Sequence, residues 1–183
     1  MEIEDIVNSD TTGLGGYVVS CNVFANAGGN IYADVGDVIE LIATSVKVIA
    51  AYRWYDQAGN LVHTGQIFNT VVSSSQTYIL EVIANCGNSA TTEVSVIIKP
   101  NRIESISSNP ATDQIIVTYK INQAENAQLL ISNYYFLGIL DNRILDIYNT
   151  SEMIDIHSYT SGIYVVTLIC NGIATDTKTF VKY

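Results

Sequence analysis

The pair Asn171-Gly172 stands between two apolar runs of strand length, 162–170 and 173–181. Asn followed by Gly readily supplies the two positive φ angles of a tight type I′ turn, which joins neighbouring antiparallel strands. The pattern therefore predicts a β-hairpin here. We expect this hairpin to finish the chain at Tyr183 without a tail.

The composition favours sheet throughout. Of the 183 residues, 48% are hydrophobic and 14% are charged, which is enough apolar material for one large or two small domains. The apolar residues are mostly Val, Ile and Tyr, whose stiff or broad side chains suit a pleated sheet better than a helix. We expect an all-β protein.

The charge and the termini restrict the partners. Acidic residues outnumber basic ones 18 to 8, for a net charge of −10, which disfavours nucleic acid and anionic membranes as partners. No stretch approaches the roughly 20 apolar residues of a membrane span, and the first residues lack the pattern of a signal peptide. Low Lys content with many Asn, Ser, Thr and Tyr is nevertheless typical of secreted surface proteins. We expect a fragment whose leader and larger parts lie upstream.

Turn signals divide the first half into short strands. Residues 1–16 show no strand or helix periodicity and are interpreted as a flexible linker. Trp54 lies mid-strand, where an aromatic packs between two sheets, and Tyr78 precedes Leu80 as in a tyrosine corner. These features predict an immunoglobulin-like β-sandwich over 17–100. Its expected strands are 17–25, 38–43, 51–56, 60–64, 67–72, 76–83 and 90–98.

A proline-containing polar segment, Lys99-Pro100-Asn101-Arg102, then interrupts the strand pattern and predicts a domain boundary. The second domain, 101–183, is expected to be a seven-stranded sandwich, so that two consecutive β-sandwich domains make up the chain. Its expected strands are 103–107, 115–120, 127–133, 138–145, 153–156, 162–170 and 173–181.

Three cysteines allow at most one internal disulfide. In an immunoglobulin-like topology the first strand begins near the turn before the last strand, so Cys21 and Cys86 could approach bonding distance. Either state of this pair remains open. Cys170 is expected to be a buried apolar residue rather than a reactive thiol. The inter-sheet disulfide of antibody domains is missing, and apolar packing around Leu41 and Leu80 must replace it.

No arrangement of residues predicts catalysis, a metal site or a cofactor. His63 and His157 lie in different domains without a nucleophile or a ligand pattern beside them. Two acidic pairs could hold calcium in a loop, but neither lies in a twelve-residue calcium loop, and solvated loops are the simpler interpretation. These pairs are Asp34 with Asp37 and Asp141 with Asp146. An exposed aromatic patch is expected at Tyr134-Tyr135-Phe136, with edge packing as the alternative.

Three segments of the second domain carry a resemblance to a known family. Asn109-Pro110-Ala111 follows Ser108, Gly162-Ile163-Tyr164 follows an acidic and apolar segment, and Lys178 is followed by Phe180-Val181-Lys182. In this order at the C-terminus they resemble the C-terminal sorting domain of the type IX (Por) secretion system of certain Gram-negative bacteria. Ser108 replaces the usual first proline of that family. The resemblance covers about 103–183 and makes these motif residues the sorting signal: Asn109, Pro110, Gly162, Ile163, Tyr164, Lys178 and Lys182.

The resemblance implies a role in export. Outer-membrane secretion machinery would recognise the folded domain and deliver an upstream cargo domain of the same polypeptide to the cell surface or the medium. Such domains are usually removed at the surface, so the resemblance implies processing near the joint, at Lys99, Pro100, Asn101, Arg102, Ile103 and Glu104. Substitution of Lys182 should abolish export with the fold intact, whereas substitution of Gly162 or Tyr164 should damage packing.

The first domain is similar to immunoglobulin-like or PKD-like modules that often precede sorting domains, most clearly over 52–60. A spacer is the first interpretation of this module. Adhesion or carbohydrate binding through its loops is the alternative. Catalysis is not expected, because no nucleophile, base and orienting group can be assembled from the sequence.

Overall fold

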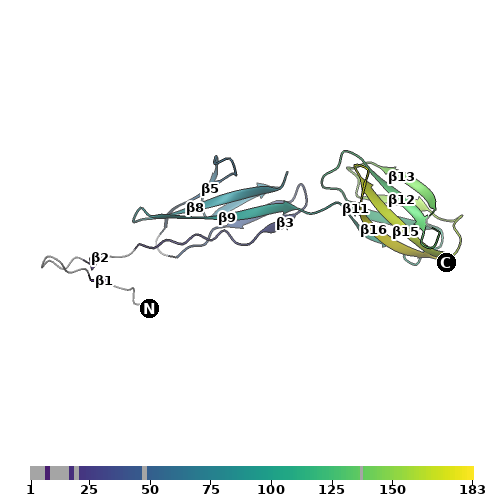
Figure 1. Ribbon diagram of the computed structural model, residues 1–183, viewed down its shortest axis with the longest axis horizontal. Coiled ribbons are helices and arrows are strands. Elements are labelled where there is room, and N and C mark those ends of the chain that lie inside the picture. Colours follow the sequence, from purple (N-terminus) through teal and green to yellow (C-terminus); the bar gives the residue numbers. More distant parts are fainter. Residues whose placement is uncertain (1–6, 9–16, 19–20, 47–48, 137) are drawn as a thin grey trace. The chain divides into compact units, whose positions relative to one another are not determined.

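The computed structural model consists of two compact units, Met1–Ile98 and Lys99–Tyr183 (Figure 1). The structure describes residues 7–8, 17–18, 21–46, 49–136 and 138–183. All regular secondary structure within these residues is β-strand, which confirms the expected all-β fold. The same residues contain no helix that is long and apolar enough to cross a membrane.

The first unit is a sandwich of two sheets. Val38–Ile42 (β4) pairs with Ile67–Val71 (β7) in one sheet. The other sheet has the order β3-β9-β8-β5-β6. Its strands are Ile31–Ala33 (β3), Ser89–Ile98 (β9), Gln76–Ala84 (β8), Ile49–Tyr55 (β5) and Leu61–Thr64 (β6). This arrangement confirms the predicted immunoglobulin-like sandwich.

Trp54 lies fully buried in the core of this sandwich, as predicted. Its Nε1 donates a hydrogen bond to the carbonyl oxygen of Gly65 at 3.0 Å, which satisfies the polar end of the ring. Leu41 and Leu80 are also fully buried, so apolar packing does replace an inter-sheet disulfide. Tyr78 differs from a tyrosine corner, because its hydroxyl donates to Oε1 of Gln76 at 3.1 Å instead of to the main chain.

The start of the first unit departs from the prediction. Instead of one strand over 17–25, Tyr17–Val18 (β2) pairs with Val7–Asn8 (β1), two residues that the sequence assigns to a linker. The rest of 1–16, and 19–20, lie outside the described residues. In the following segment, Nδ2 of Asn88 donates to the carbonyl of Cys21 at 2.7 Å, and the main chain of Asn26 pairs with that of Thr44. The short strand β3, parallel to β9, was not predicted, because three residues show too little periodicity.

The second unit is a sandwich of a three-stranded and a four-stranded sheet, with the orders β10-β11-β14 and β13-β12-β15-β16. Its described residues form the seven strands that the sequence predicts, with boundaries that differ by at most two residues. The first sheet contains Arg102–Ser107 (β10), Gln114–Lys120 (β11) and Ser151–Asp155 (β14). The second contains Ala127–Asn133 (β12), Ile139–Leu145 (β13), Gly162–Cys170 (β15) and Ile173–Lys182 (β16).

The terminal hairpin has the predicted turn. Asn171 and Gly172 both have positive φ, 50° and 79°, between the antiparallel strands β15 and β16. The side chain of Asn171 also connects the turn to a neighbouring loop, because its Oδ1 accepts from the amides of Glu125 at 2.9 Å and Asn126 at 3.3 Å. Local turn chemistry and a tertiary contact therefore agree at this position.

We expect the two units to unfold separately under urea. Leu80→Ala should destabilise the first unit by about 2–5 kcal/mol, because it leaves a cavity in a fully buried position. The single tryptophan of the chain, Trp54, reports this unfolding by fluorescence. The matched change in the second unit, Leu168→Ala, should leave the fluorescence transition in place and shift a circular dichroism transition. A common shift of both transitions in either variant would contradict separate unfolding.

Candidate functional site

The Asn109-Pro110-Ala111 segment lies along the outer edge of β16. The amide of the Asn109 side chain makes two hydrogen bonds to this strand: Nδ2 donates to the carbonyl of Thr179 at 3.2 Å, and Oδ1 accepts from the amide of Val181 at 2.9 Å. The side chain thus pairs with β16 as the main chain of a neighbouring strand would. Because Asn109 and Val181 are 72 positions apart, the fold joins the first and the last motif segments.

The main chain of Ala111 continues this pairing. Its amide donates to the carbonyl of Val181 at 2.8 Å, and its carbonyl accepts from the amide of Tyr183 at 3.0 Å. The Ala111 side chain is 2% exposed, so the segment is packed against the domain as well as hydrogen-bonded to it. An exposed strand edge invites pairing with other chains, and this segment covers the C-terminal part of the β16 edge.

Gly162-Ile163-Tyr164 opens β15 directly opposite the end of β16. Tyr164 is buried, its ring stacks on Phe180 with centroids 5.3 Å apart, and its hydroxyl donates to the carbonyl of Thr160 at 2.6 Å. Ile163 pairs with Val181 and is half-buried on the other face of the sheet. Tyr164 is therefore a packing residue, as expected.

Gly162 does not meet the expectation that a side chain here damages packing. A Cβ at this position would lie 4.0 Å from Nδ2 of Asn133 and from Cε2 of Tyr164, which is ordinary van der Waals distance. Gly162 also lies outside the left-handed φ region occupied by Gly172. Local space and backbone conformation thus leave room for alanine.

The two lysines of the motif lie in different environments. Lys182 is 9% exposed, and its Nζ donates to the main-chain oxygen of Tyr183 at 2.6 Å, whereas Lys178 is exposed. The burial of Lys182 argues against the expectation that a variant here leaves the fold intact, because removing a buried hydrogen-bonded ammonium also disturbs packing. The fold brings Lys182 close to the Asn109 segment, through a bridge between Ala111 and Lys182.

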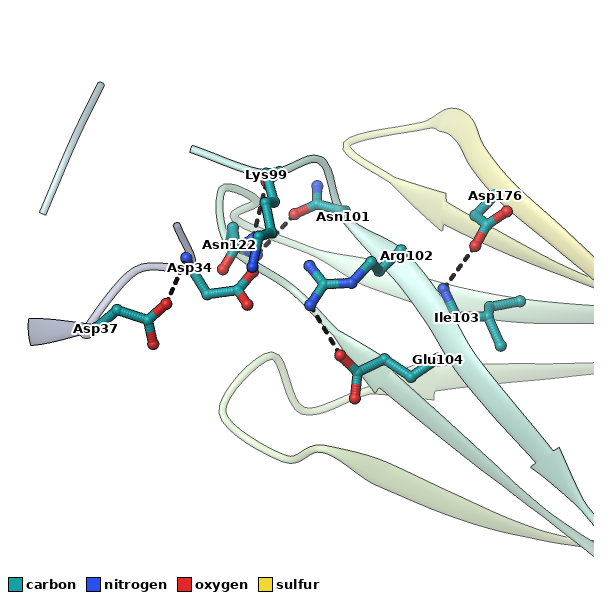
Figure 2. A network of polar contacts seen from close by, with 9 residues as sticks. All are labelled: Asp34, Asp37, Lys99, Asn101, Arg102, Ile103, Glu104, Asn122 and Asp176. Atoms are coloured by element: carbon teal, nitrogen blue, oxygen red, sulfur yellow. Dashed lines mark hydrogen bonds and ion pairs between the residues drawn. The ribbon is translucent and has the colours of Figure 1, made fainter. Parts of the chain in front are cut away.

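Residues of the proposed processing region are anchored within the second unit (Figure 2). Oδ1 of Asn101 accepts from the amides of Asn122 at 2.7 Å and Gln123 at 3.0 Å, and its Nδ2 donates to the carbonyl of Gln123 at 3.0 Å. Nδ2 of Asn122 in turn donates to the carbonyl of Lys99 at 2.8 Å. This group of contacts, the Asn101 clamp, fastens the joint to the loop after β11.

The next residues belong to β10 itself. The guanidinium of Arg102 pairs with Glu104 at 2.8 Å, and the amide of Ile103 donates to Oδ2 of Asp176 on β16 at 2.8 Å (Figure 2). Ile103 is 2% exposed, whereas Pro100 is exposed. Sequence reasoning missed Asp176 and Asn122, because such long-range bonds leave no periodic signal.

The cysteines are arranged in one bonded pair and one thiol. Cys21 and Cys86 form a disulfide, with Cα atoms 6.4 Å apart, which ties the start of the first sandwich to the turn between β8 and β9. Cys170 is a buried free cysteine in the core of the second unit. Its sulfur accepts from Oγ1 of Thr175 at 3.7 Å, which is consistent with the predicted packing role.

The two histidines belong to different units. The His63 ring stacks on Phe68 with centroids 5.0 Å apart. His157 Nδ1 lies 3.0 Å from Oδ1 of Asp113, and both side chains are largely exposed. The hydrogen bond from His157, together with the charges of His157 and Lys182, lowers the pKa of the Asp113 carboxyl. This pair fastens the loop before β11 to the loop after β14.

The acidic pairs bind protein groups. Oδ2 of Asp37 accepts from the amide of Asp34 at 2.9 Å, and Asp141 forms an ion pair with Arg143 at 2.9 Å instead of pairing with Asp146. In the part of the chain that the structure describes, no group of three or more His, Cys, Asp or Glu side chains could hold a metal ion. Asp37 therefore stabilises a turn, whereas Asp141 pairs within strand β13.

The aromatic patch expected at Tyr134-Tyr135-Phe136 is exposed, with Phe136 at 84%. Oδ1 of Asn133 accepts from the amides of Tyr135 at 2.9 Å and Phe136 at 3.3 Å, which orders the turn. The amide of Tyr134 donates to the carbonyl of Ile163 at 3.0 Å. This aromatic loop thus lies beside the Gly162-Ile163-Tyr164 motif.

Two family models match the chain. Residues 25–100 match an Ig-like domain, CHU_C associated, and residues 106–182 match a secretion system C-terminal sorting domain. The chain carries an Ig-like domain followed by a type IX sorting domain. The sorting domain is a secretion signal, so the protein is secreted or displayed at the cell surface. It implies interaction with the type IX secretion machinery, and domains of both kinds are in general non-catalytic.

Several solved structures show likeness at low identity. The two fibronectin type III domains of chicken tenascin are 10% identical over 87% of this chain and 96% of that chain, with a TM-score of 0.40. Dimeric latent PorU from Porphyromonas gingivalis is 12% identical over 88% of this chain and 20% of that chain, with a TM-score of 0.41. Insect hemolin is 13% identical over 94% of this chain and 48% of that chain, with a TM-score of 0.39. No curated protein matches the chain.

We expect Asn109→Ala to loosen the β16 edge of the sorting domain. The substitution removes two hydrogen bonds and should cost about 1–3 kcal/mol of unfolding free energy. Hydrogen exchange at the Val181 amide should become faster. Asn109→Asp keeps the acceptor for that amide and is the matched control, in which protection should persist. Equal exchange rates in the wild type and Asn109→Ala would contradict this role.

Removal of the disulfide should destabilise the Ig-like domain alone. Closing a loop between cysteines 65 positions apart stabilises the fold by about 4 kcal/mol in the chain-entropy relation. The Cys21→Ser/Cys86→Ser double variant should therefore unfold at lower urea concentration, measured by Trp54 fluorescence. Cys170→Ala, in the other domain, should leave that transition unchanged. An unaltered midpoint in the double variant would show that the bridge adds no stability.

Proposed function

We propose that the chain is the non-catalytic C-terminal region of a larger secreted protein, in which the sorting domain addresses an upstream cargo to the outer-membrane secretion machinery. In this proposal the domains are 17–100 and 101–183. The observation that carries the proposal is that the fold brings the first and the last motif segments together, because Asn109 and Ala111 are hydrogen-bonded to the last residues of the chain. A signal assembled from distant segments is recognised as a folded surface.

A non-catalytic role is supported by the environment of the side chains that most often perform catalysis. Cys170 is buried among apolar residues, which disfavours a reactive thiolate. His63 stacks on Phe68, and the pair of His157 with Asp113 is largely exposed to solvent, where charges are screened. The proposed work of the chain is therefore recognition and delivery.

The Ig-like domain is proposed to act as a spacer between the cargo and the sorting domain. Trp54, the side chain best suited to stack on a sugar ring, is fully buried. It is therefore occupied by the core and gives no support to carbohydrate binding by this domain.

Processing near the joint is proposed to need local opening. A protease binds several residues in extended form, and such segments are usually exposed and poor in hydrogen bonds. Of the proposed region, Asn101 is clamped and Ile103 is buried in β10, whereas Pro100 is exposed. We therefore place the proposed cut on the amino-terminal side of Arg102.

Fusion to a reporter tests the proposed function. Residues 1–183 placed behind a periplasmic reporter should carry it to the surface or the medium of a strain with a type IX secretion system, measured by protease shaving and immunoblotting. A chain ending at residue 105, without the sorting domain, should leave the reporter in the periplasm. Periplasmic retention of the complete fusion, with the sorting domain folded, would refute the proposal.

Replacement of the Ig-like domain tests its role as a spacer. An unrelated β-sandwich in place of residues 17–98 should preserve export of the reporter, because the signal lies in the sorting domain. Loss of export with this replacement, while the wild-type chain exports normally, would show that the Ig-like domain itself is recognised.

A further inference from the structure

We propose that the outer face of the four-stranded sheet β13-β12-β15-β16 is the surface on which a protein of the secretion machinery docks, through an uncharged, partly apolar surface of its own. We call this surface the neutral face. The proposal rests on the proposed function, since it names the recognised part of the sorting domain. It is carried by the distribution of charge over the sheets of the chain.

The neutral face follows from the strand register. Paired residues of an antiparallel sheet point to the same side, and alternate residues of one strand also share a side. The residues on the same side as Thr167, in the centre of β15, form the outward series, and they point away from the core. These side chains are half-buried or exposed, in contrast to the buried series that includes Val166 and Leu168. The outward series consists of Gln128, Leu130, Ser132, Ile139, Asn142, Ile144, Ile163, Val165, Thr167, Ile169, Ala174, Thr177, Thr179 and Val181.

The outward series contains no charged residue. The four strands, all of which lie within the described residues, nevertheless contain five charged residues. Each of the five pairs with a member of the inward series. Asp141 and Arg143 are opposite Ile131 and Leu129 on the edge strand β13. The others, Asp176, Lys178 and Lys182, are opposite Leu168, Val166 and Gly162 on the edge strand β16. An antiparallel sheet usually places charge on its solvent face, and this sheet reverses that pattern.

The other large sheet of the chain shows the usual pattern. On the outer face of the Ig-like domain, Arg53 pairs with Glu81 at 3.6 Å, Tyr55 donates to Glu81 at 2.8 Å, and Glu93 lies in the next row. The outer face of the three-stranded sheet also carries charge, at Arg102, Lys120 and Asp155. In a chain of net charge −10, the neutral face is therefore distinctive.

Charge determines the chemistry of the partner. Burying an unpaired charge in an interface is costly, whereas threonine, serine and aliphatic side chains lose water at low cost when their polar groups find partners. A surface without charge fits a partner surface that is itself uncharged. Unlike the rest of this acidic chain, the neutral face neither attracts cationic surfaces nor repels anionic ones.

The residues that border the neutral face favour a partner that docks on the face over a partner that adds a strand to the edge of β16. The Asn109-Ala111 segment is already hydrogen-bonded to the C-terminal edge of β16. At the same end, the aromatic loop Tyr134-Tyr135-Phe136 is bonded to Ile163 and holds exposed rings at the border. Aromatic side chains are enriched where protein interfaces form.

Charge substitution at the centre of the neutral face tests the proposal. In the 1–183 reporter fusion, Thr167→Lys and Thr167→Glu should each lower export by about tenfold or more, because either charge would be buried on docking. Thr167→Val keeps the shape and should export normally. The positional control is Thr118→Glu, because Thr118 faces outward from the central strand β11 of the opposite sheet and is also half-buried.

Each outcome decides the proposal. Thermal unfolding must show that the Thr167 variants fold, and their loss of export alongside normal export of Thr118→Glu supports docking at the neutral face. Normal export of both charged Thr167 variants overturns it while leaving the proposed function intact, whereas failure of the unmodified fusion refutes the proposed function itself. Two further results also overturn it. If the wild type is a dimer that Thr167→Glu dissociates, the face binds a second copy of the chain. If the wild type alone floats with lipid vesicles, the face binds a lipid surface.

Discussion

The hydrogen bonds between the Asn109 segment and β16 are the constraint on which the sorting domain depends. A terminal strand at the border of a sheet leaves its outer amides and carbonyls without partners, and such an edge frays or pairs with other chains. The side chain of Asn109 and the main chain of Ala111 supply partners for Thr179, Val181 and Tyr183. The last strand is thereby fixed by residues that lie before β11.

With its edge fixed, β16 connects the two layers of the sandwich. Phe180 stacks on Tyr164 in the core, and Asp176 accepts the amide of Ile103 from the opposite sheet. Because Ile103 follows the Asn101 clamp, the same strand stabilises the beginning of the domain. The Asn109 segment, the Asn101 clamp and the core are therefore parts of one folded unit, and disturbance at one of them is expected to weaken the others.

How much of the structure the sequence predicts depends on how far apart along the chain the interacting residues lie. The Asn171-Gly172 turn and the strands of the second domain were predictable, because turn chemistry and alternation act over a few residues. The parallel strand β3 was not, since its three residues carry little pattern. The bonds of Asn101 and Asn109, across 21 and 72 positions, are also absent from local patterns. The resemblance predicted the motif residues but not the burial of Lys182.

Burial changes what the motif can do. Tyr164 and Lys182 are almost inaccessible, so a partner that meets the folded domain cannot read them directly. Their neighbours along the chain, Ile163 and Val181, pair with each other and point to the opposite side of the same two strands, toward solvent. Because adjacent residues of a strand alternate between faces, fixing the inward residues also fixes the outward ones. The inward residues of the motif segments thus fix the register of the strands that carry the neutral face, and under our proposal recognition depends on buried residues without contact to them.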